Sequence, residues 1–205
     1  LLITISLYSK WDIFKKIFID KKKLFILFIS GFLIFVNWGV WIYAVSKDKI
    51  IDASFGYFIM PIISVFLGNF FFKERITKKG KIAILLVIIS VGYLLITDFT
   101  SIPWVGLIVA LSWSFYNLFR KKINVETDVG LFIESLYILP FVLIAFYFIT
   151  INGYNDFSLS KPSLMPLLML AGPMTVIPLF LYVRGVELAG LGPAGMIFYI
   201  TPTLQ

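Results

Sequence analysis

Long stretches without charge constrain this chain more than any other feature of its sequence. Leu24–Ser46 contains no charged residue, and Ile50–Phe72 contains only Asp52. A helix needs about 20 mostly apolar residues to cross the ~30 Å hydrocarbon layer of a bilayer, and both runs are long enough. Further runs follow, with Glu134 as the one charge inside them. We therefore predict an all-α polytopic membrane protein with complete spans at 24–46, 50–72, 82–99, 103–119, 130–151 and 163–184.

Composition excludes most other classes of protein. Hydrophobic residues make up 60% of the chain and charged residues 14%, against about 45–50% and about 25% in soluble domains. The chain contains neither Cys nor His, which removes disulfides, thiolate ligands, and the commonest metal ligand and general base. The sequence accordingly predicts no catalytic residues, no metal site and no cofactor. It also lacks a phosphate-binding loop for direct coupling to ATP.

Basic residues alternate between the loops that join these runs. Loop 9–23 carries six Lys, loop 73–81 five basic residues and loop 120–129 three, whereas loops 47–49, 98–102 and 152–162 together carry three. Positive residues collect in cytoplasmic loops, so the first set of loops is predicted to lie in the cytoplasm. These loops also account for the net charge of +7, and no nucleic-acid partner is predicted.

A shift of 141 positions aligns the chain with itself. The shift passes over five spans, an odd number, so the two halves must have opposite orientations, as in the inverted repeats of many secondary transporters. We expect residues 1–99 to be part of a first repeat and residues 100–205 part of a second. Both ends of the chain fall inside apolar runs, so we expect a fragment of a larger protein. The aligned pairs include Gly31 with Gly172, Trp41 with Tyr182, Ala53 with Ala194, and Pro61 with Pro202.

Small, aromatic and polar side chains within the spans are candidates for contact with a substrate. On the span 50–72 they share one face at spacings of three and four residues. Packing between helices is the competing interpretation, because small residues let helices approach closely. Pro61 and Pro202 occupy equivalent positions in the repeat, and we predict that they bend their helices for function. The cavity candidates are Asn37, Trp41, Tyr57, Met60, Ser64, Tyr116, Phe198 and Tyr199.

Two ionisable residues within the spans are candidates for coupling. Ionisable groups inside a membrane are costly and commonly functional. Glu134 lies about one turn into its predicted helix and is a candidate for substrate contact or for coupling to protons. Asp52 lies near the outer end of its helix, where a negative charge also favours the helix N-terminus, so a simple capping role competes with coupling.

Several ordered motifs resemble one transporter group. The chain resembles the RarD (chloramphenicol-sensitivity-like) group of the EamA family, within the drug/metabolite transporter superfamily. The resemblance rests on 52–61 (DASFGYFIMP), Asn37-Trp38, Lys73-Glu74-Arg75, Phe115-Tyr116, Arg120-Lys121-Lys122, Gly130–Glu134 and Tyr199–Leu204.

This resemblance implies a multi-pass protein of the bacterial cytoplasmic membrane. It implies ten helices in two inverted five-helix repeats, with both termini cytoplasmic and this chain running from the end of helix 2 into helix 9. The family usually has Glu where this chain has Asp52. It usually has Asn where this chain has Met60 and Gln where it has Phe198, so we expect a substrate more apolar or aromatic than is usual.

Together these features favour a secondary transporter that exports or exchanges a small metabolite or drug by alternating access. Its expected partners are a small-molecule substrate and the lipid bilayer, with a proton as candidate coupling ion and a homodimer as an assembly left open. A non-transporting membrane scaffold and an integral membrane enzyme are the alternatives. An enzyme would need clustered catalytic groups, whereas Asp52 and Glu134 are predicted near opposite faces of the membrane, about one hydrocarbon thickness apart.

Overall fold

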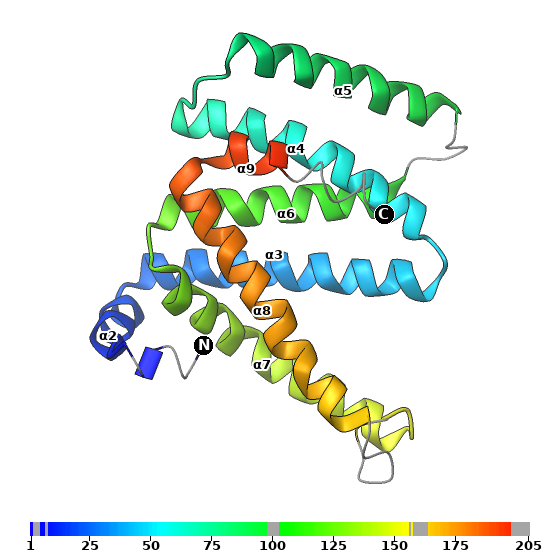
Figure 1. Ribbon diagram of the computed structural model, residues 1–205. Helices are drawn as coiled ribbons and strands as arrows, with labels where there is room; N and C mark the ends of the chain where they lie inside the picture. The colour runs from blue at the N-terminus through cyan, green and yellow to red at the C-terminus, as the bar shows by residue number, and fades with distance from the viewer. Residues whose placement is uncertain (2–4, 7, 98–102, 156, 158–163, 198–205) are drawn as a thin grey trace. The chain divides into compact units, whose positions relative to one another are not determined.

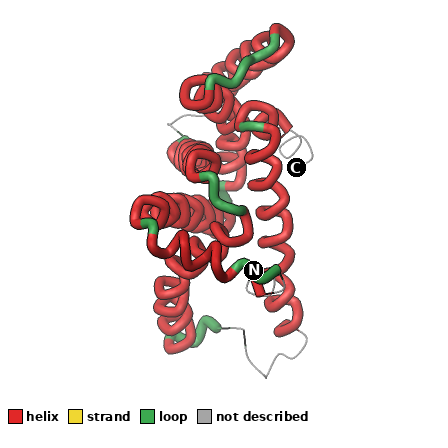
Figure 2. The backbone as a smooth tube through the Cα atoms, turned by 90° about the vertical axis from the view of Figure 1, so that its left-hand side faces the viewer, coloured by secondary structure: helices red, strands yellow, loops and turns green. Residues whose placement is uncertain are grey.

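The computed structural model describes residues 1, 5–6, 8–97, 103–155, 157 and 164–197, and every regular element in these ranges is an α-helix (Figures 1 and 2). The prediction of an all-α protein is confirmed. A short helix, α2 (Trp11–Ile19), precedes the long ones. These are α3 (Lys21–Ser46), α4 (Ile50–Phe72), α5 (Lys78–Thr97), α6 (Trp104–Ile123), α7 (Thr127–Ile151) and α8 (Leu164–Ala189), followed by α9 (Leu191–Ile197).

Among the described residues, α3, α4, α5, α7 and α8 are long and apolar enough to cross a membrane. Helix α4 covers Ile50–Phe72, the range predicted from the sequence. Helix α6 forms where the span 103–119 is expected, but it is not among the apolar five. Its last turn is basic, and the polar residues Ser112, Ser114 and Asn117 lie on its buried face. Helix α6 is therefore stabilised by contact with protein more than by contact with lipid.

The chain divides into two compact units. The first contains Leu1–Gly31 and Val125–Arg184, and the second contains Phe32–Asn124 and Gly185–Gln205. The long helices α3 and α8 each contribute to both units. Each unit has buried residues of its own, Leu27, Val129 and Ile133 in the first and Met60, Val105 and Val109 in the second.

In the second unit, α4 packs lengthwise on α6 and also contacts α9 (Figure 1). The two helices approach closely at Gly56 and Gly106. A Cβ on Gly56 would overlap the carbonyl oxygen of Gly106, and a Cβ on Gly106 would overlap the carbonyl oxygen of Asp52. Small residues at such crossings bring backbones together in membrane helices. The glycines of α4 and α6 therefore set the position of α4, which carries most of the candidate site.

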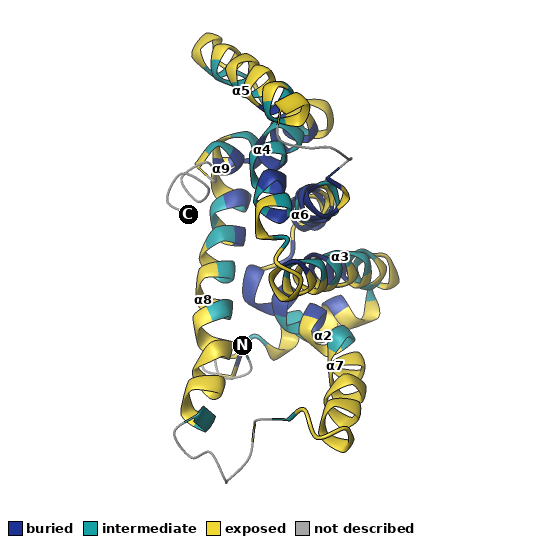
Figure 3. Cartoon of the chain, turned by 90° about the vertical axis from the view of Figure 1, so that its right-hand side faces the viewer, coloured by how far each residue is buried: buried dark blue, intermediate teal, exposed yellow. Residues whose placement is uncertain are grey.

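Apolar side chains stay exposed along helices at the margins of each unit. Val91 is the only buried residue of α5 in the described range, and most of the α5 surface is exposed in Figure 3. The second half of α7, from Phe141 to Ile151, is exposed throughout. Because the hydrophobic effect disfavours such surface in water, this pattern fits helices that face lipid.

In the first unit, ion pairs connect the segment before α2 to the start of α7. Lys10 Nζ lies 2.7 Å from Glu126 Oε2 and 2.6 Å from Asp128 Oδ2. The rings of Phe14 and Phe132 pack nearby, with centroids 5.7 Å apart. Partial burial by itself lowers the pKa of Lys10, but its hydrogen bonds to the two carboxylates raise that pKa above the usual 10.5. The contact joins loops 9–23 and 120–129, which the charge pattern predicts on the same side of the membrane.

Candidate functional site

Asn37 of α3 contributes a buried polar contact to the second unit. Its side chain is 5% exposed, and Nδ2 donates hydrogen bonds to the Val109 carbonyl oxygen at 2.9 Å and to Ser112 Oγ at 3.0 Å. Buried polar groups need such partners. Asn37 thus faces protein, and its amide connects α3 to α6.

Trp41 and Tyr57 come together as an aromatic pair. Their ring centroids are 5.3 Å apart, with an edge-to-face angle of 60°. Trp41 also lies against the buried cluster of Ala44, Ala53 and Val105. Both rings are half-buried, so this pair from α3 and α4 keeps aromatic surface available beside the core of the second unit.

Met60, Ser64 and Tyr116 are fully buried, with exposures of 0%, 1% and 0%. Ser114 Oγ of α6 donates to the Met60 carbonyl oxygen at 3.3 Å. Helix α9 also packs on α4, where Gly195 lies against Ser64 and Pro61. In the conformation seen here, this face of α4 is thus filled by helix packing, the interpretation that competes with a cavity.

Ser64 differs from the other polar residues on this face. Its Oγ is buried and has no hydrogen-bond partner among the described residues. An unsatisfied buried hydroxyl costs about 1–3 kcal/mol. Of the remaining candidates, Pro61 lies inside α4, and Phe198, Tyr199 and Pro202 lie outside the described residues.

Glu134 lies in the first unit, on the part of α7 that packs against the start of α3. Its side chain is 2% exposed, and Ser30 Oγ donates a hydrogen bond to Oε1 at 2.5 Å. A Cβ on Gly31 would lie 3.4 Å from the Glu134 carbonyl oxygen, so a small residue gives α7 room to approach. The sequence singles out Glu134, but it does not predict Ser30 as its hydrogen-bond donor.

Asp52 occupies the first turn of α4. Its Oδ1 is buried without a hydrogen-bond partner in the described part of the chain, and no side chain caps this helix at Lys49. The position in the first turn favours a carboxylate through the helix dipole, but Asp52 Oδ1 makes no capping hydrogen bond within the described residues.

Glu74, just beyond α4, makes contacts that the candidate list did not include. Its Oε1 accepts a hydrogen bond from the Leu191 backbone N–H at 3.0 Å, and Oε2 accepts one from the Gly192 N–H at 2.9 Å. Lys121 of α6 forms a short ion pair with Oε1. One carboxylate therefore connects the exit of α4, the end of α6 and the start of α9. The sequence offers one signal for it, the Lys73-Glu74-Arg75 match at the helix exit.

Arg120, beside Lys121 on α6, is a charged residue buried within the second unit. Its side chain is fully buried, and Nη2 lies 3.5 Å from Glu187 Oε1. Glu187 is distant from Arg120 in the sequence, so hydropathy cannot predict this ion pair.

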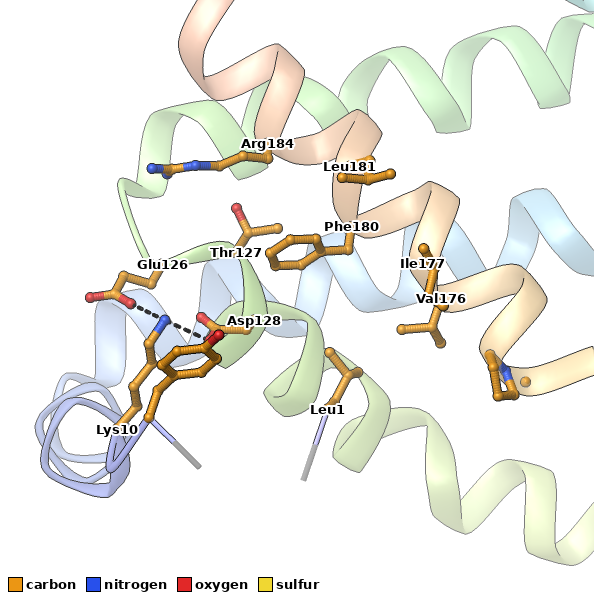
Figure 4. A pocket seen from close by; sticks show the side chains of 13 residues that line it. Leu1, Lys10, Glu126, Thr127, Asp128, Val176, Ile177, Phe180, Leu181 and Arg184 are labelled. Atoms are coloured by element: carbon orange, nitrogen blue, oxygen red, sulfur yellow. Dashed lines mark hydrogen bonds and ion pairs between the residues drawn. The ribbon is translucent and has the colours of Figure 1, made fainter. Parts of the chain in front are cut away.

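The first unit contains a cavity of about 1050 Å³ (Figure 4). Val176, Ile177, Phe180 and Leu181 of α8 form an apolar wall, and the Lys10 ion pairs lie toward its other end. A smaller cavity of about 410 Å³ lies in the second unit, next to Glu74. Among the described residues, the substrate candidates Asn37, Trp41, Tyr57, Met60, Ser64 and Tyr116 do not line either of these two cavities.

The apolar helices, the buried polar contacts between them and the basic loops define a multi-pass, all-helical membrane protein. Among the described residues, no group of three or more acidic side chains is arranged to hold a metal ion. The EamA-like transporter family matches residues 1–96.

Relatives extend this match over the whole chain. The RarD protein of Salmonella typhi is 35% identical over 201 residues, which cover 98% of this chain and 68% of the relative. RarD of Escherichia coli K12 is 34% identical over 205 residues, covering 100% and 69% of the two chains. A Vibrio cholerae protein named as a transporter is 33% identical, with coverage of 100% and 68%. No solved structure matches the chain significantly.

The chain belongs to the EamA-like transporter family and is of the RarD type. It is a multi-pass transporter of a bacterial membrane, as the motifs imply.

Proposed function

We propose that the protein is a secondary transporter that exports or exchanges a small metabolite or drug by alternating access. In this proposal, residues 1–99 and 100–205 belong to two inverted repeats, and the substrate meets both. The substrate-binding residues are Asn37, Trp41, Tyr57, Met60, Ser64 and Tyr116, together with Phe198 and Tyr199 of the second repeat. Pro61 and Pro202 provide the bends around which the site is built.

The observation that carries this proposal is the buried hydroxyl of Ser64. It lies on α4, at the contact with α9 of the other half, and finds no hydrogen-bond partner in the described residues. An unsatisfied buried hydroxyl is destabilising, and we infer that Ser64 is retained because its hydroxyl binds the substrate in another conformation. Separation of α9 from α4 would uncover Ser64 and Met60, beside the half-buried Tyr57.

Glu134 is the residue that we propose for proton coupling. It is a buried carboxylate within a membrane helix, hydrogen-bonded to the Ser30 hydroxyl. Protonation would convert this acceptor into a neutral donor and change its bond with Ser30. Asp52 is the second candidate, and its place in the first turn of α4 makes a structural role the stronger one.

The proposed site favours an apolar or aromatic substrate. Met60 and Phe198 stand where the family places amides, and Trp41 and Tyr57 add aromatic surface. An apolar wall gains about 25 cal/mol for each Å² of apolar ligand surface that it covers. It leaves a polar ligand's donors unpaired at about 1–3 kcal/mol each.

Uptake by the full-length protein in liposomes tests the proposal. We expect phenylalanine to be preferred over serine, which shares its zwitterionic group but lacks the aromatic ring. The double variant Met60→Asn/Phe198→Gln should shift this ratio toward serine, and wild-type protein under proton and sodium gradients identifies the coupling ion. An unchanged ratio would remove Met60 and Phe198 from the site, and absence of uptake under every gradient would count against transport itself.

A further inference from the structure

We propose that Glu74, Lys121, Leu191 and Gly192 form a clasp that holds the cytoplasmic side of the transporter closed and must open whenever that side opens. The inference rests on the proposed alternating-access function and names a device within it. Glu74 belongs to the first half of the chain, whereas Lys121 and the start of α9 belong to the second.

The clasp is built from charge-assisted bonds. The two carboxylate oxygens of Glu74 accept separate hydrogen bonds from successive backbone amides at the start of α9, at 3.0 and 2.9 Å. The first amides of a helix have no partner within the helix, and a carboxylate there is also favoured by the helix dipole. Lys121 neutralises the same carboxylate through Oε1. Each partner of Glu74 thus stabilises the charged form.

The backbone around Glu74 is shaped to admit its side chain. Gly190 has φ +99°, a conformation that residues with a side chain rarely adopt, and a Cβ there would lie 2.8 Å from Glu74 Oε1. A Cβ on Gly68 would lie 2.7 Å from Oε2. Asn69 Nδ2 also donates to the Glu74 carbonyl oxygen at 3.0 Å. Glycines on α4 and before α9 therefore leave a fitted space for one carboxylate.

The surroundings of the clasp leave room for movement. A cavity of about 410 Å³ lies beside Glu74, bounded by Val65, Ile84, Pro193 and Met196 among others. Close packing resists small shifts, and here the packing is interrupted next to the start of α9. Besides the van der Waals contacts of Gly68 with Leu191 and of Val65 with Gly192, the bonds of Glu74 hold this end of α4 to α9. These bonds can be exchanged for bonds to water.

The charge state of Glu74 suits this role. Burial alone would raise the pKa of its carboxyl, but hydrogen bonds from Lys121, Gly192 and Leu191, with the charge of Lys121, lower the pKa below its usual value of 4.5. Glu74 is therefore ionised at neutral pH.

The test measures access from the cytoplasmic side in the full-length protein, freed of any cysteines. Ser64→Cys is the reporter, because Ser64 is 1% exposed and faces α9. In inside-out vesicles, we expect Glu74→Gln to raise the labelling rate of this thiol by a membrane-impermeant maleimide about tenfold, equivalent to about 1.4 kcal/mol. Glu126→Gln is the matched control, since it removes another loop carboxylate paired with a lysine, and it should leave the rate unchanged.

Two further variants separate the clasp from a simple ion pair. Glu74→Lys/Lys121→Glu restores opposite charges but places an ammonium at the two α9 amides, so labelling should stay fast. A return to the wild-type rate would overturn the role of the α9 amides. Glu74→Asp keeps the charge with a shorter reach and should give an intermediate rate, which provides a folded variant if Glu74→Gln is unstable.

Unchanged labelling in both Glu74→Gln and Glu74→Asp would overturn the clasp. The outcomes distinguish this inference from the proposed function. Wild-type protein that transports while the variants label slowly contradicts the clasp alone. Wild-type protein that transports nothing contradicts the proposed function, whatever the labelling rates.

Discussion

Gly195 of α9 faces Ser64 of α4 so closely that a Cβ on the glycine would lie 3.0 Å from the serine Cβ. The contact continues in antiparallel register, since Gly68 of α4 lies against Leu191, and Val65 lies near Gly192. Under the 141-residue shift, α4 and α9 are equivalent helices. Their direct contact fits the proposed inverted repeat, and the proposed alternating access would require movement at this contact.

Locking this contact should stop transport. In Ser64→Cys/Gly195→Cys the two Cβ atoms would lie 3.0 Å apart. The usual Cβ–Cβ distance in a disulfide is about 3.5–4.5 Å, so a small shift suffices to form the bond. We expect oxidation to reduce uptake to background and reduction to restore it. Each single Cys variant, treated with the same oxidant, is the control. Full uptake by the cross-linked protein would show that α4 and α9 need not separate.

Gly56→Ala should destabilise the protein, because the new Cβ collides with backbone atoms of Gly106 that cannot move aside easily. Overpacking of this kind costs roughly 1–3 kcal/mol. Gly92→Ala is the matched control on α5, where a Cβ meets nothing within 4 Å, and there alanine should stabilise the helix by about 0.5–1 kcal/mol. Thermal unfolding in detergent measures both. Equal midpoints for the two variants would contradict the close α4–α6 crossing.

Glu134→Gln should abolish uptake driven by a pH gradient while substrate exchange stays measurable, because the amide cannot carry the coupling proton. Ser30→Ala removes the hydrogen-bond donor and should reduce pH-driven uptake less severely. Paired measurements of gradient-driven uptake and exchange in liposomes separate coupling from binding. If both activities survive in Glu134→Gln at wild-type rates, Glu134 is structural.

Acid should open the clasp. A carboxylate whose pKa is lowered by folding contributes stability above its usual pKa and loses it as the pH falls through the lowered value. Labelling of the Ser64→Cys reporter should therefore stay constant from about pH 8 to about pH 5 and rise only below the usual carboxyl pKa. Rates are divided by those of Lys78→Cys, an exposed reporter, to remove the pH dependence of the thiol itself. The Glu74→Gln variant should show no such rise.

Orientation can be tested by labelling intact cells. A Cys at Ser9 or Lys78 should be shielded from an impermeant thiol reagent, and one at Asn155 should react, because the basic loops are predicted to lie in the cytoplasm. Permeabilised cells, in which all three should react, provide the control. The reverse pattern would reject the orientation.

Hydropathy predicted most of the helices because lipid-facing positions of a membrane-spanning helix require apolar side chains. Helix α4 matches its predicted range, and α3, α5 and α7 extend it by a few polar residues that lipid does not constrain. Contacts of charged side chains with partners distant in the sequence could not be predicted in the same way. Glu74 meets Leu191 across 117 positions, and Arg120 meets Glu187. Such pairs depend on how helices pack, which the residue pattern of a single helix does not contain.

The candidate site was predicted in part for the same reason. Polar residues in apolar runs, such as Asn37 and Glu134, are visible because lipid excludes them. Their partners, Ser112 and Ser30, carry no comparable signal, since serine is tolerated in membrane helices by bonding its own backbone. Whether Met60 and Tyr116 line a cavity or pack a core depends on the conformation, which composition does not encode.

The buried polar face of α6 has a consequence for how this protein enters the membrane. Alone, α6 is less apolar than its neighbours, and Ser112 and Ser114 are satisfied partly by groups on α3 and α4. Its insertion is therefore favoured once those two helices are already in the bilayer to receive it. Substitutions at Asn37 or Gly56 should therefore impair membrane insertion during synthesis. In the affected chains α6 would fail to insert, and every later loop would lie on the wrong side of the membrane.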